Sequence, residues 1–494
     1  MKNQYKYLLF GLLSMTLASC SMNGSAAYLK GGYNGNYNYY TPAAVSTNDN
    51  FYSQEEAPTD TQENSFVKIT EETKTSNVSL TSTSFAYTTV REAITNNQMY
   101  NAKRLVKTEE MLNYFSYGYT NETDDALTTH LEMAECPWNN EHYLASVVVK
   151  AKPSKVDNVK NNIVILVDKS GSMSGIFGLV KTSLHTLVDN LTNDDKVSIV
   201  SYASGCKVEA EGLTGKDKTK LNKVIDDLKA SGSTWGEGGI EKAYEVAYKY
   251  FIDGGNNRVV LLTDGDFNVG KVSGKELTAL IKKKAADGVY LTCCGYRSYN
   301  NDTLYTLADN GNGNAYYIDC ELEAKKVFEE ELGKSLYVVA KDAKCQVEFS
   351  SAVASYRLLG YETRQMSDEE FDDNRKDAGE IMSDHTTVAF YELELKSEEP
   401  EDYFFKATLR YKDPLSQEPR EVIKKKATLG VGRHADFDFA SYVAEFSLVL
   451  SESKYKGTSS YNHLVERINN DYINDKYRDD FISMVNKAKQ LSND

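Results

Sequence analysis

The 494-residue sequence is poor in basic residues, histidine, cysteine and proline. Lysine and arginine together number 56 against 72 aspartates and glutamates, so the formal net charge is −16. A surface that binds nucleic acid needs clustered positive charge, and this balance argues against such a protein. With 6 histidines, a histidine-rich zinc site is not expected. The mean hydropathy of −0.51 excludes a protein with several membrane spans.

What is present is the composition of a folded protein. Hydrophobic residues make up 41% of the chain, charged residues 26% and aromatic residues 11%, with tyrosine especially frequent at 35 copies. A chain of this length exceeds one ordinary domain, and about three domains are expected.

The amino terminus has the pattern of an export signal. Lys2 and Lys6 precede an apolar run over residues 8–17, which is about half the roughly 20 residues that a membrane-spanning helix requires. The sequence Leu17-Ala18-Ser19-Cys20 resembles the lipobox of bacterial lipoproteins. The resemblance implies a signal peptide over residues 1–19 and a lipid on Cys20. The alternative is an ordinary signal peptide with an incidental cysteine.

Residues 20–76 show neither helical nor strand periodicity and are rich in Asn, Tyr, Gly, Ser and Thr. They are predicted to form a disordered tether that holds the folded part away from the membrane. Ser21 is not the acidic residue that retains many lipoproteins at the inner membrane. We therefore expect a lipid anchor in the bacterial cell envelope, at the outer rather than the inner membrane.

Six cysteines remain after Cys20, at irregular spacing. We interpret them as small buried hydrophobic residues, with disulfides or metal ligands as the alternative. Cys293 and Cys294 lie in a predicted strand, so they should point to opposite faces of a sheet.

Residues 156–333 alternate between apolar strands and helices. The run Ile163-Val164-Ile165-Leu166-Val167 is continuous and β-branched or aliphatic, which is typical of a strand buried on both faces. Further strands are predicted at 197–202, 259–262, 289–294 and 315–318, with helices between them. This order predicts an α/β fold with a doubly wound parallel sheet, whose ligand should bind at the carboxyl ends of the strands.

The flanking regions differ from this pattern. Residues 77–126 form a predicted amino-terminal helical segment, with a helical pattern from 84 to 115. Residues 127–155 and 334–430 show strand alternation and predict one antiparallel, β-sandwich-like domain into which the α/β domain is inserted. Residues 431–494 predict a carboxyl-terminal helical segment.

Oxygen-bearing side chains gather where two predicted strands end. The first strand ends in Asp168-Lys169-Ser170-Gly171-Ser172, and a later one ends in Thr263-Asp264-Gly265. The glycine-rich loop over residues 231–239, which contains Thr234, lies between them in sequence. Carboxylate and hydroxyl oxygens suit Mg²⁺, with Ca²⁺ or Mn²⁺ as alternative ions. Two carboxylates and three hydroxyls leave a coordination position that a carboxylate of a partner protein would fill.

These residues resemble the metal-ion-dependent adhesion site of von Willebrand factor type A domains. The resemblance implies that the metal ligands are Asp168, Ser170, Ser172, Thr234 and Asp264. The chain from about residue 85 to the end resembles an exported bacterial subfamily with a characteristic amino-terminal segment and a carboxyl-terminal domain of unknown function, and four longer stretches carry this resemblance. They are residues 109–115, 137–139, 257–270 and 356–362.

Other readings of the same residues stay open. Asp168, Ser170 and Ser172 could cap the following helix, with Asp264-Gly265 as a turn. Trp235 either contacts the partner or packs internally, and Glu237 either shields the metal or competes for it. The alternative function is a Mg²⁺-dependent hydrolase or phosphatase of the envelope. A non-enzymatic binding protein is preferred, because there is neither a Gly-x-Ser-x-Gly sequence nor a Walker loop and the histidines are scattered.

Overall fold

The α/β part of the chain is built on a six-stranded sheet with the strand order β10-β9-β8-β5-β6-β7. The computed structural model describes residues 62–121, 123–153, 160–233, 236–265, 274–296, 301–332, 338–396, 402–414, 416, 418–427, 434–470 and 475–492. All neighbours in this sheet are parallel except β6 and β7, which are antiparallel. The strands are β5 (Asn161–Asp168), β6 (Lys196–Tyr202), β7 (Cys206–Thr214), β8 (Asn256–Thr263), β9 (Val289–Gly295) and β10 (Ala315–Tyr317).

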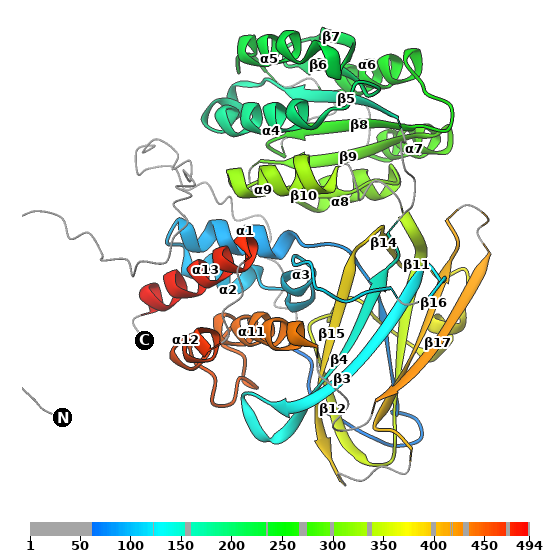
Figure 1. The fold of residues 1–494 in the computed structure, drawn as a ribbon, viewed down its shortest axis with the longest axis vertical. Helices are drawn as coiled ribbons and strands as arrows, with labels where there is room; N and C mark the ends of the chain where they lie inside the picture. The colour runs from blue at the N-terminus through cyan, green and yellow to red at the C-terminus, as the bar shows by residue number, and fades with distance from the viewer. Residues whose placement is uncertain are drawn as a thin grey trace, which may run out of the picture. The chain divides into compact units, whose positions relative to one another are not determined.

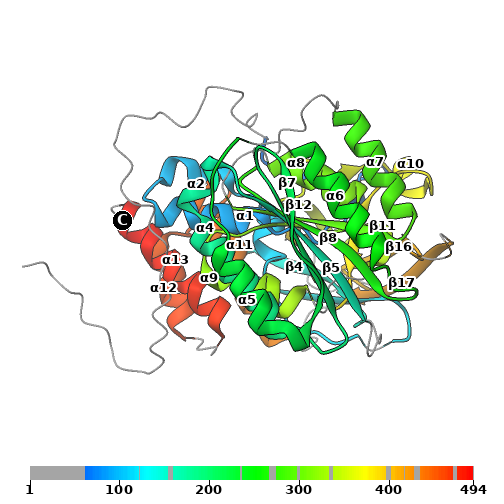
Figure 2. The same ribbon diagram turned by 90° about the horizontal axis from the view of Figure 1, so that it is seen from above.

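Helices bury both faces of this sheet, and Figure 2 shows α4 and α5 on one side and α6 and α7 on the other. Along β5, Ile165 and Val167 belong to one apolar core, whereas Val164 and Leu166 belong to the other. This arrangement confirms the predicted doubly wound α/β fold. The helical elements are η1 (Gly171–Gly175), α4 (Phe177–Asn190), η2 (Gly215–Asp217), α5 (Lys218–Asp227), α6 (Gly236–Lys249), α7 (Gly274–Ala286), α8 (Asn301–Asn310), α9 (Glu321–Lys325) and the π-helical turn η3 (Lys326–Glu331).

Five of the six described cysteines are buried as predicted, and the prediction is wrong for Cys206. Cys293 and Cys294 belong to the two opposite cores of the α/β sheet, as their adjacent positions in β9 predict. All six cysteines of the described ranges are free thiols, and five of them are buried, with Cys206 exposed.

Two antiparallel sheets with a shared apolar core form the second unit (Figure 1). One sheet has the order β1-β12-β15-β4-β3, and the other has the order β13-β2-β11-β16-β17, with β14 paired to β11. In the chain, β5 to β10 lie between β4 and β11, so the α/β unit interrupts this sandwich. The elements are β1 (Val67–Lys68), β2 (Thr75–Ser79), β3 (Leu127–Cys136), β4 (Asn139–Ala151), β11 (Val338–Phe349), β12 (Val353–Leu359), β13 (Gln365–Met366), α10 (Asp368–Asp372), β14 (Gly379–Met382), β15 (Thr386–Leu395), β16 (Phe405–Lys412) and β17 (Pro419–Ala427).

Helices from both ends of the described chain cover one face of this sandwich. Their apolar side chains share a core with Val148 of β4 and Val388 and Phe390 of β15. α11 is buried over nearly its whole length. The helices are α1 (Phe85–Thr95), α2 (Met99–Leu105), α3 (Thr108–Leu112), α11 (Ala435–Leu450), α12 (Tyr461–Asn470) and α13 (Lys476–Ser492).

Two sequence-based expectations differ from the structure near the amino terminus. The predicted tether runs to residue 76, but the folded part already includes β1 and the start of β2, which pairs with β11. β2 is polar and is held by backbone pairing and by a hydrogen bond from Asn77 Nδ2 to Asp368 Oδ1 at 2.7 Å, so apolar periodicity cannot reveal it. The helical pattern over 84–115 forms three helices, because Asn97 adopts a left-handed conformation with φ of +59° and residues 106 and 107 are extended.

A buried arginine joins the amino-terminal helix to the α/β unit. Arg91 of α1 is 2% exposed and donates from Nε and Nη2 to both carboxylate oxygens of Asp319, at 2.7 and 2.5 Å. The same guanidinium contacts Glu323 Oε2 of α9 at 3.0 Å and Asp480 Oδ2 of α13 at 2.8 Å. Three segments far apart in sequence therefore share one buried positive charge.

Two buried glutamates fix the backbone around α3. Glu109 Oε2 accepts the Tyr361 N–H at 3.0 Å, and Glu110 Oε2 accepts the Ala86 N–H of α1 at 2.9 Å. Gly360 has φ of +76°, and a Cβ there would lie 2.6 Å from Glu109 Oε2, so this position requires glycine. Burial, and next the charge of Glu110, raises the pKa of Glu109 to about 7.

Glu109→Gln should stabilise the protein at alkaline pH. The pKa of Glu109 is about 7 in the fold against 4.5 ordinarily, so the penalty for its ionisation grows as pH rises between these values. Glutamine keeps an acceptor for the Tyr361 amide, and we expect the free energy of unfolding to rise by about 2–3 kcal/mol at about pH 8 and by little below about pH 5. Urea unfolding across this pH range tests this, with Glu466→Gln on the exposed face of α12 as control. Equal effects of the two substitutions would contradict the prediction.

Candidate metal centre

The two predicted acidic ligands lie at the same edge of the α/β sheet. β5 and β8 are parallel neighbours in which Val167 pairs with Leu262, so Asp168 and Thr263 end the two strands side by side. Asp264 follows directly. Asp168 is 0% exposed and Asp264 is 3% exposed. The parallel register therefore brings two buried carboxyl groups to the carboxyl ends of adjacent strands.

Three hydroxyl or amide groups hold the Asp168 carboxylate in place. Its Oδ1 accepts the Ser170 backbone N–H at 2.7 Å, and its Oδ2 accepts hydrogen bonds from Tyr202 Oη at 3.1 Å and Thr263 Oγ1 at 3.4 Å. Burial raises the pKa of Asp168, and the charge of Asp264 raises it further, against the hydrogen bonds from Ser170. A cation between the two carboxylates would relieve their mutual repulsion.

The serines extend this oxygen cluster toward the surface. The Oγ atoms of Ser170 and Ser172 are 2.9 Å apart, with Ser170 buried and Ser172 exposed. Ser170 precedes η1 without a capping hydrogen bond from its side chain, and the side chain before α4 makes none either. The helix-capping alternative therefore does not account for the serines, although the Asp168–Ser170 hydrogen bond is a local turn contact.

The glycine-rich loop reaches the same edge. The Ser231 N–H donates to Lys169 O at 2.6 Å, and the Gly171 N–H donates to Gly232 O at 2.9 Å. Gly232 has φ of +96°, and a Cβ there would lie 2.7 Å from Ser204 Oγ, so the close approach requires glycine.

Thr234 and Trp235 lie outside the described residues, as does the side chain of Glu237 at the start of α6. Cys20, the predicted lipid site, also lies outside the described residues.

The donor set fits a hard divalent cation. Carboxylate and hydroxyl oxygens are the ligands that Mg²⁺ prefers, and water completes its octahedral shell. Within the described ranges there is no group of three or more His, Cys, Asp or Glu side chains that could hold a metal. Two carboxylates alone are too few, so hydroxyl or water ligands are required. The metal-binding role of Asp168, Ser170, Ser172, Thr234 and Asp264 stays a prediction.

Sequence reasoning missed the two hydroxyl groups that orient Asp168. Tyr202 ends β6, the strand next to β5, and Thr263 ends β8. The place of Thr263 directly before Asp264 was an available signal for it, whereas nothing in the local sequence marks Tyr202. Gly239 lets α6 pack closely against Tyr202. A Cβ at this position would lie 2.9 Å from Tyr202 Cβ.

Comparisons with known proteins agree with this organisation. The family described as "von Willebrand factor type A domain" matches residues 162–330, and "Uncharacterized protein YfbK, C-terminal" matches residues 334–491. A third family, "von Willebrand factor", matches residues 52–146. In the described part of the chain, no helix combines the length and apolar character needed to cross a bilayer.

Two curated relatives and one solved structure illustrate what the chain is similar to. The chain is 34% identical over 420 residues to "Uncharacterized protein YfbK" of Escherichia coli (strain K12), covering 78% of this chain and 72% of the relative. It is 25% identical to "Uncharacterized protein sll0103" of Synechocystis, covering 63% of this chain and 76% of the relative. The solved "von Willebrand factor type A from Catenulispora acidiphila" aligns with 75% of this chain and 91% of its own, with a TM-score of 0.38 and 14% identity. The chain therefore belongs to the family of von Willebrand factor type A proteins that carry the YfbK carboxyl-terminal domain.

Proposed function

We propose that the type A domain binds Mg²⁺ and, through it, an acidic side chain of a partner protein. The observation that carries this proposal is the pair of buried carboxylates, Asp168 and Asp264, beside the Ser170 and Ser172 hydroxyls at one edge of the sheet. The proposed metal ligands are these four residues and Thr234. Membership of the type A family suggests a role in protein–protein interaction or as an adhesion scaffold. A cluster of oxygen donors that can hold a metal ion agrees with such a role.

Each described residue has a definable part in this site. Tyr202 and Thr263 donate hydrogen bonds to Asp168 Oδ2 and fix the orientation of the carboxylate. Ser172 is exposed, so the cluster borders solvent, where a partner would dock. When bound, the cation would supply a positive charge with an open coordination position for the partner's carboxylate. Trp235 and Glu237 are proposed to contact the partner.

We also propose that the protein is anchored by a lipid on Cys20 and carried on a tether in the bacterial cell envelope, at the outer membrane. The sequence around Cys20 supports this, together with the low periodicity of the residues before 62. Mass spectrometry of the protein from membrane fractions should find a lipid on Cys20, and the Cys20→Ser variant should carry none. This measurement tests the anchor independently of the metal site.

Thr234→Ala should weaken Mg²⁺ binding about tenfold, because it removes one neutral ligand and leaves both carboxylates. Calorimetric titration of the full chain with Mg²⁺ measures this, with Thr73→Ala in the exposed turn after β1 as control. Equal affinities of the two variants would contradict the assignment of Thr234.

The proposed partner binding is tested by affinity capture from intact envelopes with and without Mg²⁺. We expect a protein that is retained with Mg²⁺ and released by EDTA, and that the Asp168→Ala variant fails to retain. The hydrolase alternative predicts metal-dependent turnover of generic phosphate or ester substrates by the purified protein. Turnover that Asp168→Ala abolishes, without capture of any partner, would overturn the binding proposal in favour of the enzyme.

A further inference from the structure

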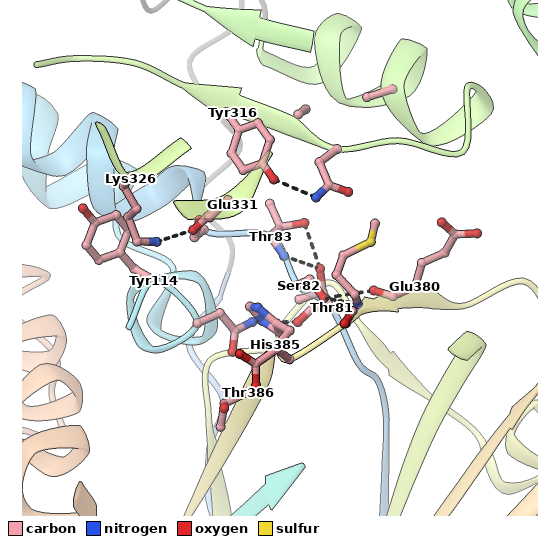
Figure 3. Close-up of a pocket in the computed structure, with 18 of the residues that line it drawn as sticks. Thr81, Ser82, Thr83, Tyr114, Tyr316, Lys326, Glu331, Glu380, His385 and Thr386 are labelled. Carbon is pink, nitrogen blue, oxygen red and sulfur yellow. Dashed lines mark hydrogen bonds and ion pairs between the residues drawn. The ribbon is translucent and has the colours of Figure 1, made fainter. Parts of the chain in front are cut away.

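A polar cavity of about 190 Å³ shares no lining residue with the metal edge (Figure 3). Neutral hydroxyl and amide side chains make up half of its lining residues, among them those of residues 81–84, Tyr316 and Thr386. Ser116 and Asp384 of the wall are exposed, so the cavity borders solvent. An engineered cavity of roughly 150 Å³ holds benzene, so this cavity has room for a six-membered ring.

The carboxylates of the wall are compensated, so the cavity does not select a cation. Four of them form ion pairs: Glu331 with Lys326 at 2.8 Å, Asp384 with Lys150 at 2.7 Å, Glu330 with Lys476 at 2.6 Å and Glu380 with Lys341 at 3.5 Å. Burial raises the pKa of the fifth, Asp309, and three nearby cations act against burial: Lys282, Lys341 and Arg364. A cationic ligand would also be repelled by the charges of Lys326 and Lys150, which act on His385 in the wall.

The wall does not select an anion either. Lys326 carries the one positive charge among the described residues that line the cavity. Its ammonium is paired with Glu331 and lies 4.1 Å from the centre of the Tyr114 ring. Burial, with the charges of Lys326 and Lys150, lowers the pKa of His385 to about 3, so the imidazole is neutral near pH 7. An anion would therefore lie among five carboxylates without an unpaired cation in the wall.

Two neutral atoms of the wall lack a hydrogen bond. Thr386 is 3% exposed, and neither its Oγ1 nor His385 Nε2 has a partner within the described part of the chain. An apolar ligand would leave both atoms unsatisfied, which is costly in a buried site. A hydroxyl group donates and accepts, so it can satisfy the Thr386 hydroxyl and either tautomer of the neutral His385 ring.

The wall also offers an aromatic surface. Tyr316 lies across the cavity from His385, and Asn314 Nδ2 donates to Tyr316 Oη at 2.8 Å, which holds the ring in place (Figure 3). The face of such a ring is apolar and can pack against C–H groups of a ligand.

We propose that this cavity binds a neutral six-membered ring with several hydroxyl groups, that is, a monosaccharide or the terminal sugar residue of a glycan. Thr386 and His385 are its hydrogen-bonding partners, and Tyr316 packs against its C–H groups. A sugar brings several hydroxyls and no charge, which agrees with a wall of paired charges and unpartnered neutral atoms. Water alone is the competing occupant.

Calorimetry with the full chain tests the charge of the ligand. The probes are glucose, galactose and mannose, and each is compared with its amino sugar and its uronate, which place a positive or a negative charge on the same ring. We expect at least one neutral sugar to bind with a dissociation constant below about 10 mM, and at least about tenfold more tightly than both of its charged forms. Its methyl glycoside then identifies the source, because a glycan terminus predicts retained affinity and a free sugar predicts lost affinity.

Two results would overturn the proposal. A cavity that holds water alone predicts that no neutral sugar binds below about 10 mM. A charged form that binds as tightly as the neutral sugar, or more tightly, would show that the site does not select a neutral ligand.

Two variants locate the binding. Thr386→Val and His385→Phe each remove one hydrogen-bonding atom and should weaken the bound sugar at least about fivefold. Thr386→Val should do so without lowering the unfolding midpoint, since its hydroxyl has no partner in the fold. Thr129→Val is the matched control, because Thr129 is 4% exposed, its Oγ1 also lacks a partner among the described residues, and it does not line the cavity. It should change neither affinity nor midpoint. Undiminished binding in both Thr386→Val and His385→Phe would refute the site.

Discussion

Replacing Asp168 by asparagine should abolish the stabilisation of this protein by Mg²⁺. Loss of one of two carboxylate ligands is expected to weaken Mg²⁺ binding at least about 100-fold, or roughly 2.7 kcal/mol. At a Mg²⁺ concentration of about 100 times its dissociation constant, the wild type gains about 2.7 kcal/mol in the free energy of unfolding, and the variant should gain less than about 0.5 kcal/mol. Urea unfolding with and without Mg²⁺ measures both values.

The metal-free fold should tolerate this change. Burial and the charge of Asp264 raise the pKa of Asp168, so the ionised carboxylate is unfavourable without a cation. Asparagine removes that charge, and its carbonyl can still accept the Ser170 N–H. We therefore expect the metal-free stability to stay the same or to rise by up to about 1 kcal/mol.

A second buried aspartate provides the control for Asp168. Asp195 is 4% exposed at the amino end of β6 and accepts the N–H groups of Asn161 at 3.1 Å and Thr192 at 2.8 Å. Asp195→Asn should destabilise the metal-free protein but keep the gain from Mg²⁺. If Asp168→Asn kept that gain as well, Asp168 would not be a metal ligand.

The centre of the fold and the carboxyl edge of its sheet were predictable from local sequence. A continuous apolar strand, as in β5, requires burial on both faces, and parallel register then brings Asp168 and Asp264 together. β7 was not predicted, because its sequence is polar and it pairs antiparallel at the edge of the sheet, where only two of its nine residues are buried. Apolar periodicity reports burial, so it misses strands that are held mainly by backbone pairing.

Contacts between segments far apart in the sequence could not be predicted from apolar periodicity. The hydroxyl of Tyr202 reaches Asp168 only because β6 lies beside β5, and a lone tyrosine at a strand end does not reveal it. Likewise, Arg91 is one polar residue within a helical pattern. Its partners Asp319 and Asp480 are 228 and 389 residues away in the chain. Such pairs depend on how separate units pack, which composition and periodicity do not encode.

Arg91→Met should destabilise the protein by about 3–5 kcal/mol, because it leaves Asp319, Glu323 and Asp480 buried without their shared cation. The loss should be largest at neutral and alkaline pH. Burial raises the pKa of Glu323 to about 7, so part of the uncompensated buried negative charge is neutralised as pH falls below that value. Urea unfolding of the full chain at about pH 5 and about pH 8 measures the loss and its pH dependence.

An exposed arginine–aspartate pair is the control that shows whether burial or ion pairing causes the loss of stability in Arg91→Met. Arg375 Nε contacts Asp373 Oδ1 at 3.0 Å, but the Arg375 side chain is 91% exposed. Arg375→Met should therefore leave the free energy of unfolding nearly unchanged, because water screens an exposed ion pair. Arg91→Lys tests the geometry, since lysine keeps the charge but cannot form the two-pronged contact with Asp319, and it should recover part of the loss. If Arg91→Met were no more destabilising than Arg375→Met, the buried arginine would not hold α1, α9 and α13 together.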